Sequence, residues 1–258
     1  MEAEAKHIEK EAYQLLTEEK FTEAFRLFRR AAETYRTEHN HKQAALMFAS
    51  AASCWGLKTG ERVVHQAALA YKDAAWEAEK ASDFEYASLL YQYAATNFEK
   101  DLEFEHLSEC SYRSKECQRA FLLLGLIQPR KIHRISGQKE EKGVVGVIKR
   151  FLLWVMLTFS FLLWGHGERP LRTFFYGLTL IAICALAFSQ TTLLSNGAPL
   201  RPNFFQALYL SVITFTTVGY GDITPLGFAK AVAMFEALNG LFIIPILVTG
   251  LSRKYLRI

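Results

Sequence analysis

The sequence predicts an all-α protein in two parts: an α-solenoid of helix pairs, and a membrane domain with two spanning helices. Two observations support this prediction. Residues 1–125 hold 16 basic and 21 acidic side chains, whereas residues 151–258 hold only 7 and 3. Small residues recur at helical spacing in the first part, and long apolar runs fill the second. Collagenous, disordered and disulfide-framework classes are therefore excluded, and the composition argues against a purely soluble enzyme.

Residues 1–125 carry an internal repeat of alanines. Each adjacent pair of alanines follows another alanine at a spacing of two helical turns, so all three lie on one face of a helix. Every second copy is displaced by 43 residues, as in Ala24 and Ala67, and aromatic residues follow the same displacement, as in Phe48 and Tyr91. The repeating unit is therefore a helix pair, and about five or six helices are expected in a right-handed stack.

This repeat resembles the tetratricopeptide superfamily and, in its long helices and in residues 40–45, the SNAP adaptor branch. The resemblance covers about the first 120 residues. It implies a cytosolic stack that binds a protein or a small ligand on its concave face. For any single repeated position, however, a role in the core is the simpler interpretation. The seven histidines show no ligand spacing, so we assign them no metal, and no nucleic acid is expected as a partner.

A basic linker, residues 126–150, follows the repeats, with 7 basic and 2 acidic side chains. Beside a membrane, such a segment is attracted to anionic headgroups by about 1 kcal/mol per charge. The equal alternative is a solvated linker whose charge only sets topology. The candidate lipid-binding residues are Arg130, Lys131, Arg134, Lys149 and Arg150.

The apolar run after the linker, residues 151–164, is 14 residues long. Spanning a bilayer takes about 20 residues. Trp154 and Trp164 suit the headgroup region, and basic residues flank both ends of the run. We therefore expect residues 151–170 to form an interfacial amphipathic, aromatic helix and the lead-in to the next helix.

A pore domain is expected over residues 171–252. Its outer helix, 171–194, and its inner helix, 228–251, are long and apolar enough to cross a bilayer. With two spans, both termini lie on one side, and the positive-inside tendency makes that side the cytoplasm. Between the spans we expect a pore helix at 203–216.

The segment 207–222 resembles the pore helix and selectivity filter of potassium channels. Its filter residues are Thr217, Val218, Gly219, Tyr220 and Gly221. The resemblance implies K⁺ as the transported ion, held at Thr217, Val218, Gly219 and Tyr220, with no cofactor. A dehydrated ion needs closely spaced carbonyl oxygens, and glycine readily adopts the alternating backbone that aims successive carbonyls at one axis. One such segment cannot surround an ion, so a homotetramer is expected.

Further roles follow from the same resemblance. Asp222 stands where the family keeps an aspartate behind the filter, and Tyr209 replaces the tryptophan that bonds to it in many relatives. Gly240 and Pro245 weaken the inner helix where a gate would bend, although both residue types also occur in spanning helices without gating. The expected filter-support residues are Tyr209, Thr216, Asp222 and Glu236.

The sequence thus predicts a potassium-selective tetrameric channel that is not an enzyme. Because no series of regularly spaced arginines precedes the pore, we expect no voltage sensor. Residues 164–170 resemble the lead-in to the outer helix of some bacterial channels, which implies a plasma membrane of the prokaryotic inner type. Gating or modulation through the N-terminal helices is expected. The alternative is a membrane-anchored SNAP-like or tetratricopeptide-like adaptor with a non-conducting, channel-like anchor.

Overall fold

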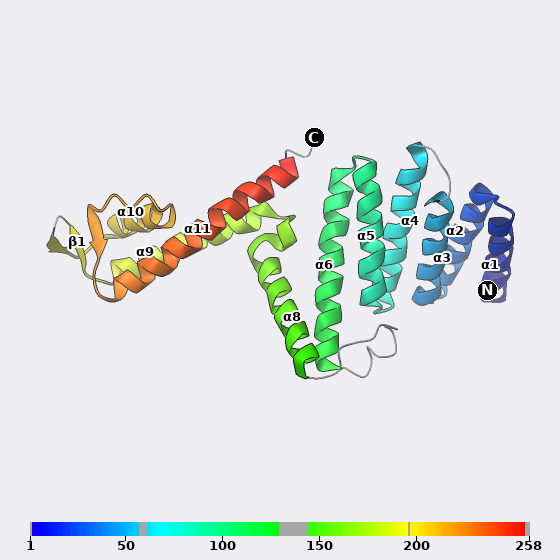
Figure 1. The fold of residues 1–258 in the computed structure, drawn as a ribbon, viewed down its shortest axis with the longest axis horizontal. Helices are drawn as coiled ribbons and strands as arrows, with labels where there is room; N and C mark the ends of the chain where they lie inside the picture. Colours follow the sequence, from blue (N-terminus) through cyan, green and yellow to red (C-terminus); the bar gives the residue numbers. More distant parts are fainter. Residues whose placement is uncertain (1, 57–60, 129–143, 196, 256–258) are drawn as a thin grey trace. The chain divides into compact units, whose positions relative to one another are not determined.

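The computed structural model describes residues 2–56, 61–128, 144–195 and 197–255. It divides into two compact units, Met1–Thr158 and Phe159–Ile258, and each is described by itself (Figure 1).

The first unit begins with six helices in the described chain. They are α1 (Glu2–Thr17), α2 (Phe21–Thr37), α3 (His41–Gly56), α4 (Glu61–Lys80), α5 (Phe84–Lys100) and α6 (Phe104–Ile127). Each of them packs against the next one in the chain, and Figure 1 shows them side by side in chain order from the blue α1 to the green α6. Their number lies within the expected range.

Alanine forms the contacts between these helices. Every alanine of the sequence repeat is buried, and none is more than 8% exposed. Small side chains let neighbouring helices approach closely, while aromatic rings such as Phe28, Phe48 and Phe98 fill the remaining space between them. Burial of such rings stabilises the unit by about 25 cal/mol for each Å² of apolar surface removed from water.

Four turns between these helices share one backbone conformation. In each turn the residue two positions after the last helical residue has a φ of 59° or 60°, and these residues are Glu19, His39, Ser82 and Leu102. The N–H of the following residue bonds back across the turn, as in Asn40 N to Tyr35 O at 2.9 Å and Asp83 N to Ala78 O at 3.0 Å. This is the Schellman ending, which usually uses glycine. The turn geometry therefore repeats with the sequence, although no glycine marks it.

Helix α8 (Val144–Trp164) begins in the first unit and continues into the second. It has 21 residues and begins seven residues before the apolar run that we expected to lie in the interface. Valine and isoleucine side chains extend the helix around Lys149 and Arg150, so the estimate of its length was too short. Three helical segments are long and apolar enough to cross a membrane: Val145–Gly167, Pro170–Ser189 and Phe228–Ser252. Length therefore gives no reason to keep α8 in the interface.

After the last residues of α8, the described part of the second unit consists of a short 3-10 helix, three further helices and a small sheet. The elements are η1 (Gly165–Gly167), α9 (Pro170–Ser189), β1 (Leu193–Ser195), β2 (Ala198–Leu200), α10 (Phe204–Phe215), β3 (Ile223–Pro225) and α11 (Phe228–Tyr255). The helices α9, α10 and α11 pack against one another in pairs. Their shared core includes Phe188, Ala207 and Ile243.

Two of the expected helix boundaries are wrong. The outer helix ends at Ser189 instead of residue 194, and the inner helix continues to Tyr255 instead of ending at residue 251. The apolar residues Leu193 and Leu194, which we expected at the end of the outer helix, belong to β1. Strand pairing with β2 and β3 satisfies their backbone groups, an option that apolar character alone does not reveal.

The sheet joins distant parts of the second unit. Its strand order is β2-β1-β3, and both pairings are antiparallel. Leu194 pairs with Pro199 in β2 and with Thr224 in β3. Through β1, the segment that leaves residues 217–221 is therefore held to the chain that follows α9.

Candidate functional site

Helix α10 is fixed at its start by a capping box. The Asn203 side chain accepts a hydrogen bond from Gln206 N at 2.8 Å, and Gln206 Oε1 accepts one from Asn203 N at 3.0 Å. These two bonds satisfy backbone donors that a helix start leaves unpaired. The helix then runs for 12 residues and ends at Phe215, with Thr216 as its C-cap. Asn203 and Thr216 are thus the caps at the two limits of the expected pore helix.

The segment that follows α10 has an unusual backbone. The φ angles of Thr217, Gly219 and Gly221 are 59°, 53° and 79°, whereas Val218 and Tyr220 are absent from the positive-φ region. Alternating signs of φ turn successive carbonyl groups toward one side of the chain, and glycine adopts positive φ at little cost. The segment can therefore present a row of carbonyl oxygens.

This segment is anchored on the last turn of α10. Val218 N and Gly219 N both donate to Ile213 O, at 2.9 Å and 3.1 Å, and Thr217 N donates to Thr214 O at 3.0 Å. Beyond these bonds the segment is open. Val218 and Tyr220 are 53% and 73% exposed in the single chain. Large apolar side chains with this exposure need cover from lipid or from other protein.

Asp222 and Tyr209 lie near each other. Asp222 directly precedes β3, and the Tyr209 side chain of α10 comes close enough for its hydroxyl to interact with that carboxylate. Ile223, the next residue, is buried and belongs to the core of the second unit. The chain that follows residues 217–221 is thus attached to the sheet through β3 and lies near α10 at Asp222.

Phe215 packs closely against two glycines, Gly240 and Gly177. A Cβ atom on Gly240 of α11 would overlap with the Phe215 carbonyl oxygen, and one on Gly177 of α9 would lie 3.3 Å from the Phe215 ring. Gly240 therefore permits a close approach between α11 and the end of α10. The sequence singled out Gly240 for bending, and it gave no sign of this contact or of the part played by Phe215.

Glu236 is fully buried and links three helices. It accepts a short hydrogen bond from Ser211 Oγ of α10, and Ser211 Oγ also contacts Ile181 O of α9 at 2.9 Å. Among the described residues, Glu236 Oε2 has no hydrogen-bond partner. The sequence predicted Glu236 as a support residue but missed Ser211. Two polar residues in separate apolar helices are a signal that could have paired them, because polar groups at this depth need each other.

Pro245, the second residue expected to act in gating, lies in the C-terminal half of α11. Pro245 lies inside the continuous helix α11, and its carbonyl accepts a hydrogen bond from Thr249 Oγ1 at 2.8 Å. Near it, Asn239 bonds to Phe235 O at 2.8 Å, and its side-chain oxygen accepts a bond from Tyr176 of α9 at 3.3 Å. Proline removes one backbone donor from the helix, so α11 has a weak point here.

A compact elbow between α8 and α9 was not foreseen. Arg172 Nη1 donates to Phe161 O at 3.3 Å, and Thr173 Oγ1 donates to Leu163 O at 3.0 Å. Trp164 Nε1 also donates to Ser160 Oγ at 2.6 Å. Side chains at the start of α9 thus satisfy the last carbonyl groups of α8, which the end of a helix leaves without backbone partners.

Of the candidate lipid-binding residues, only two lie in the described chain. Lys149 and Arg150 belong to α8, whereas Arg130, Lys131 and Arg134 lie outside the described residues.

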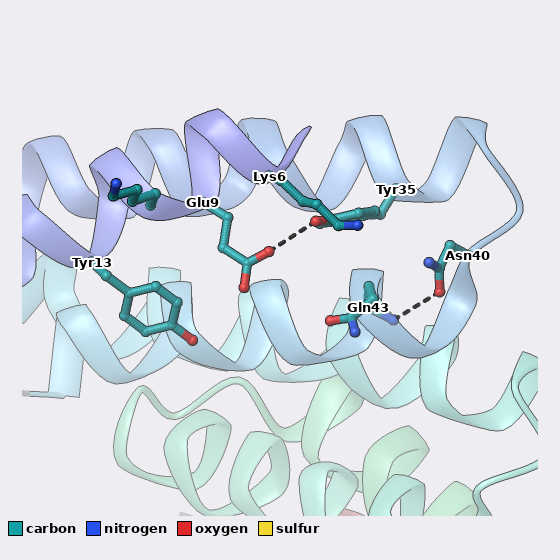
Figure 2. A pocket seen from close by; sticks show the side chains of 7 residues that line it. Lys6, Glu9, Tyr13, Tyr35, Asn40 and Gln43 are labelled. Atoms are coloured by element: carbon teal, nitrogen blue, oxygen red, sulfur yellow. Dashed lines mark hydrogen bonds between the residues drawn. The ribbon is translucent and has the colours of Figure 1, made fainter. Parts of the chain in front are cut away.

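The first unit carries a polar pocket of about 540 Å³ on α1, α2 and α3 (Figure 2). Within it the Tyr35 hydroxyl donates to Glu9 Oε2 at 2.8 Å, and Gln43 N donates to Asn40 Oδ1 at 3.3 Å. The pocket is lined by Lys6, Glu9, Lys10, Tyr13, Tyr35, Asn40 and Gln43. Both signs of charge are present, so this lining suits a polar or charged ligand.

The family comparison matches the second unit. Residues 175–257 match the model of a family described as an ion channel. The hyperpolarization-activated voltage-gated potassium channel of Methanocaldococcus jannaschii is 42% identical over 78 residues, which are 30% of this chain and 36% of that protein. Protein LctB of Bacillus caldotenax and protein LctB of Geobacillus stearothermophilus are each 46% identical over 44 residues, which are 17% of this chain and 33% of each relative.

The chain thus spans about a third of the length of the curated relatives it matches. No solved structure matches it. The match of residues 175–257 to an ion-channel family and the three apolar helices of the described chain together indicate a membrane protein.

Proposed function

We propose that this chain is the subunit of a potassium-selective channel and that residues 217–221 are its selectivity filter. The observation that carries the proposal is the alternating backbone of Thr217, Gly219 and Gly221 at the end of α10. A potassium ion exchanges its water for fixed carbonyl oxygens, and this backbone can supply them in a row. The ion-channel match and the potassium-channel relative support the same conclusion.

The channel is a homotetramer with K⁺ bound at Thr217, Val218, Gly219 and Tyr220. A single segment supplies oxygens from one direction only, so four copies around an axis are required to surround an ion. The exposed Val218 and Tyr220 side chains support assembly, because neighbouring subunits would cover them. No cofactor takes part, and the transported ion is the only ligand that the mechanism needs.

The residues around the filter hold it in place and do not bind the ion. Tyr209 and Asp222 brace its outer end, and Thr216 ends the helix from which it leaves. Glu236 braces α10 through Ser211. The negative end of the α10 dipole lies at the filter, where it favours a cation.

Gating takes place in α11. Pro245 breaks one backbone hydrogen bond, and Gly240 lowers the local helix propensity by about 1 kcal/mol relative to alanine. The first unit, as a stack of the tetratricopeptide or SNAP-like type, modulates this gate when a protein or a small ligand binds to it. A ligand can shift the gate only by the difference in its affinity for the open and closed states. The channel has no voltage sensor.

Both termini face the cytoplasm of a prokaryotic inner membrane, and the candidate basic residues 130, 131, 134, 149 and 150 contact anionic lipid. This orientation requires α8 to stay on one side. Cysteines introduced at Glu33 and at Leu226 test it, because a membrane-impermeant thiol reagent added to sealed vesicles should reach only one of them. The four native thiols are buried and should stay silent, and burial raises the pKa of Cys54 to about 11 and that of Cys110 and Cys117 to about 12.

The function is tested by potassium flux into liposomes that contain the purified chain. Barium should block the flux, and Gly219→Asp should abolish it, because a side chain and a charge would enter the row of carbonyls. Gly197→Asp is the matched control, since Gly197 also has positive φ, at 82°, but lies in the turn between β1 and β2. Equal flux in the native chain and in Gly219→Asp would refute the proposal.

The pocket on α1 to α3 favours a second candidate function, a membrane-anchored adaptor. In that case the first unit would recruit a protein and the second unit would not conduct. A silent protein in the flux assay, together with a stable partner that is lost on changing Tyr35 or Asn40, would favour the adaptor.

A further inference from the structure

Two histidine–carboxylate pairs recur at the same spacing in the first unit. His41 Nδ1 lies 2.7 Å from Glu77 Oε2, and His65 Nδ1 lies 2.6 Å from Asp101 Oδ2. Both pairs join residues 36 positions apart, and each joins a histidine of one helix to a carboxylate in or just after the next helix.

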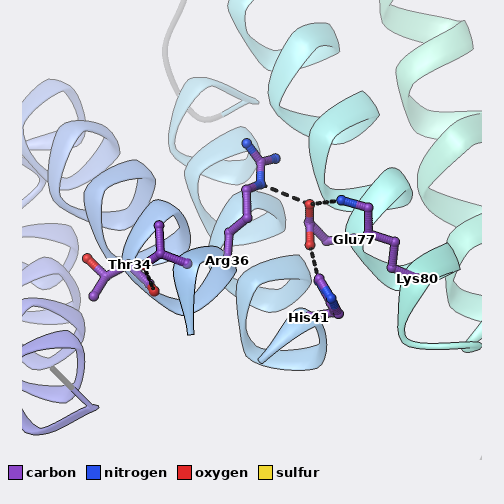
Figure 3. A network of polar contacts seen from close by, with 6 residues as sticks. Thr34, Arg36, His41, Glu77 and Lys80 are labelled. Atoms are coloured by element: carbon purple, nitrogen blue, oxygen red, sulfur yellow. Dashed lines mark hydrogen bonds and ion pairs between the residues drawn. The ribbon is translucent and has the colours of Figure 1, made fainter. Parts of the chain in front are cut away.

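The surroundings of the two pairs differ in charge. Glu77 is also bonded to Arg36 Nε at 2.9 Å and to Lys80 Nζ at 3.4 Å, as Figure 3 shows. Its charge is therefore already neutralised by cationic side chains. Asp101 has no such neighbour: in the described chain its one ion-pair partner is His65. A second carboxylate, that of Glu103, lies beside this pair instead.

The side chains of His65, Asp101 and Glu103 converge from separate elements. One ligand atom of each residue lies within 4.8 Å of the others. His65 belongs to α4, whereas Asp101 and Glu103 flank Leu102, whose φ of 60° turns the chain between α5 and α6. The ring of His65 packs edge-on against the buried Phe98, at 6.2 Å between centroids, which limits its rotation.

Glu103 differs from the corresponding residue of the preceding turn. Asp83 holds the N-cap position of α5 and accepts a hydrogen bond from Tyr86 N at 3.3 Å. Glu103 holds the N-cap position of α6, but its side chain makes no capping bond. The Glu103 carboxylate is therefore available to a ligand, although its position in the turn would allow it to cap the helix.

We propose that His65, Asp101 and Glu103 bind a divalent transition-metal ion of the zinc type. One imidazole nitrogen and two carboxylate oxygens match the ligands that such ions take in open sites, at about 2.0–2.2 Å from the metal. Two carboxylates balance the charge of the ion. His65 and Asp101 are 36% and 23% exposed, so an ion can enter from solvent and keep water at its open positions.

This proposal differs from the sequence-based interpretation, which assigned no metal to the histidines. The ligands are 36 and 38 positions apart in the chain, so no short motif announces them. Binding would tie α4 to the turn between α5 and α6, and it would add a second kind of ligand to the first unit. The proposal does not depend on ion conduction, because binding can be measured whether or not the second unit conducts.

Titration of the full chain, purified without a histidine tag in detergent, tests the site with Co²⁺ as an optical probe and with Zn²⁺ in competition. We expect one site per chain with a visible Co²⁺ absorption band that Zn²⁺ removes. Glu103→Gln should weaken binding at least tenfold, and His65→Asn should remove the band. Glu105→Gln is the matched control, because Glu105 lies in the first turn of α6 and outside the cluster, and this variant should bind as the native chain does.

The opposite results would overturn the proposal. If no band appears, or if Glu105→Gln weakens binding as much as Glu103→Gln does, the cluster is only an interhelical hydrogen bond with an acidic neighbour. Hydrogen exchange shows whether a variant loses metal binding only because it unfolds. In Glu103→Gln and His65→Asn, the amides of α4 and α6 should exchange as slowly as in the metal-free native chain.

Discussion

The carbonyl oxygen of Phe215 lies directly against Gly240, with no room for a Cβ atom between them. Phe215 is the last residue of α10, so the point where the chain enters residues 217–221 rests on the inner helix. Close contacts of this kind are rigid, because a packed interior has no free volume to absorb a shift. Any bending of α11 at Gly240 would therefore be felt at the base of the proposed filter.

Gly240→Ala is expected to abolish potassium flux. The added methyl group overlaps with backbone, so α10 or α11 must move, and overpacking of this kind costs about 1–3 kcal/mol or more. Flux into liposomes measures the effect, with the oligomeric state checked by cross-linking. Gly250→Ala is the matched control in the same helix and should keep native flux. Its Cβ would lie 3.2 Å from a Pro170 side-chain atom and would not overlap with a backbone carbonyl. Native flux in Gly240→Ala would contradict the rigid contact.

Substitutions at Glu236 separate support from conduction. Glu236→Gln keeps an oxygen that accepts the Ser211 hydrogen bond, so flux should persist at a similar rate. Glu236→Leu leaves the Ser211 hydroxyl without this acceptor. It should lower the free energy of unfolding by about 1–3 kcal/mol, the cost of the lost buried hydrogen bond. If Glu236→Gln abolished flux while the assembly stayed intact, the charge itself would take part in conduction.

The ion pairs around Glu77 predict acid sensitivity of the first unit. Burial opposes ionisation of Glu77, but His41, Arg36 and Lys80 outweigh it and hold the pKa of Glu77 below its ordinary value of 4.5. Because the folded pKa is the lower one, this stabilisation is complete above about pH 4.5 and is lost as the pH falls through the folded value. Hydrogen exchange in α2 and α4 should therefore accelerate in acid.

Glu77→Gln should remove that acid sensitivity and destabilise the unit at pH 7 by about 2 kcal/mol, since it leaves two cationic side chains without their shared partner. Glu99→Gln, at an exposed position of α5, is the control and should exchange as the native chain does at every pH. An unchanged pH profile in Glu77→Gln would show that Glu77 is not the titrating group.

The left-handed turn at Ser82 predicts a stabilising substitution. Ser82 has a φ of 59°, which costs a non-glycine residue about 1 kcal/mol. Ser82→Gly should stabilise the junction of α4 and α5 by about 0.5 kcal/mol after the entropy of glycine is subtracted. Ser82→Ala removes the same hydroxyl but keeps the strain, so it should leave hydrogen exchange at this junction unchanged. A gain of equal size in both variants would place the effect in the side chain.

Residue patterns predicted the local features of this chain better than its long-range contacts. The alanine repeat located the helices of the first unit because helix packing there depends on small residues at regular positions. The caps at Asn203 and Thr216 likewise depend on neighbours within one or two turns. Predictions from apolar character gave the wrong start for α8 and the wrong end for α9. A valine or leucine can belong equally to a helix, a strand or a membrane segment.

Contacts between distant residues left at most an indirect signal in the sequence, such as the two polar residues Ser211 and Glu236 in separate apolar helices. The pairs formed by Ser211 with Glu236 and by Phe215 with Gly240 each join α10 to α11 across about 25 residues. Only the fold brings such residues together. The same reason explains why a search for short motifs passed over His65 and the turn at Leu102.

Potassium selectivity requires four filter segments to surround a dehydrated potassium ion. An electron cryomicroscopy map of the full chain in potassium-containing buffer measures this directly. We expect fourfold density in which the carbonyl oxygens of residues 217–220 line an axis, with ion density between successive rings of oxygens. A map in which these segments stand apart, or meet without such rings, would contradict the account.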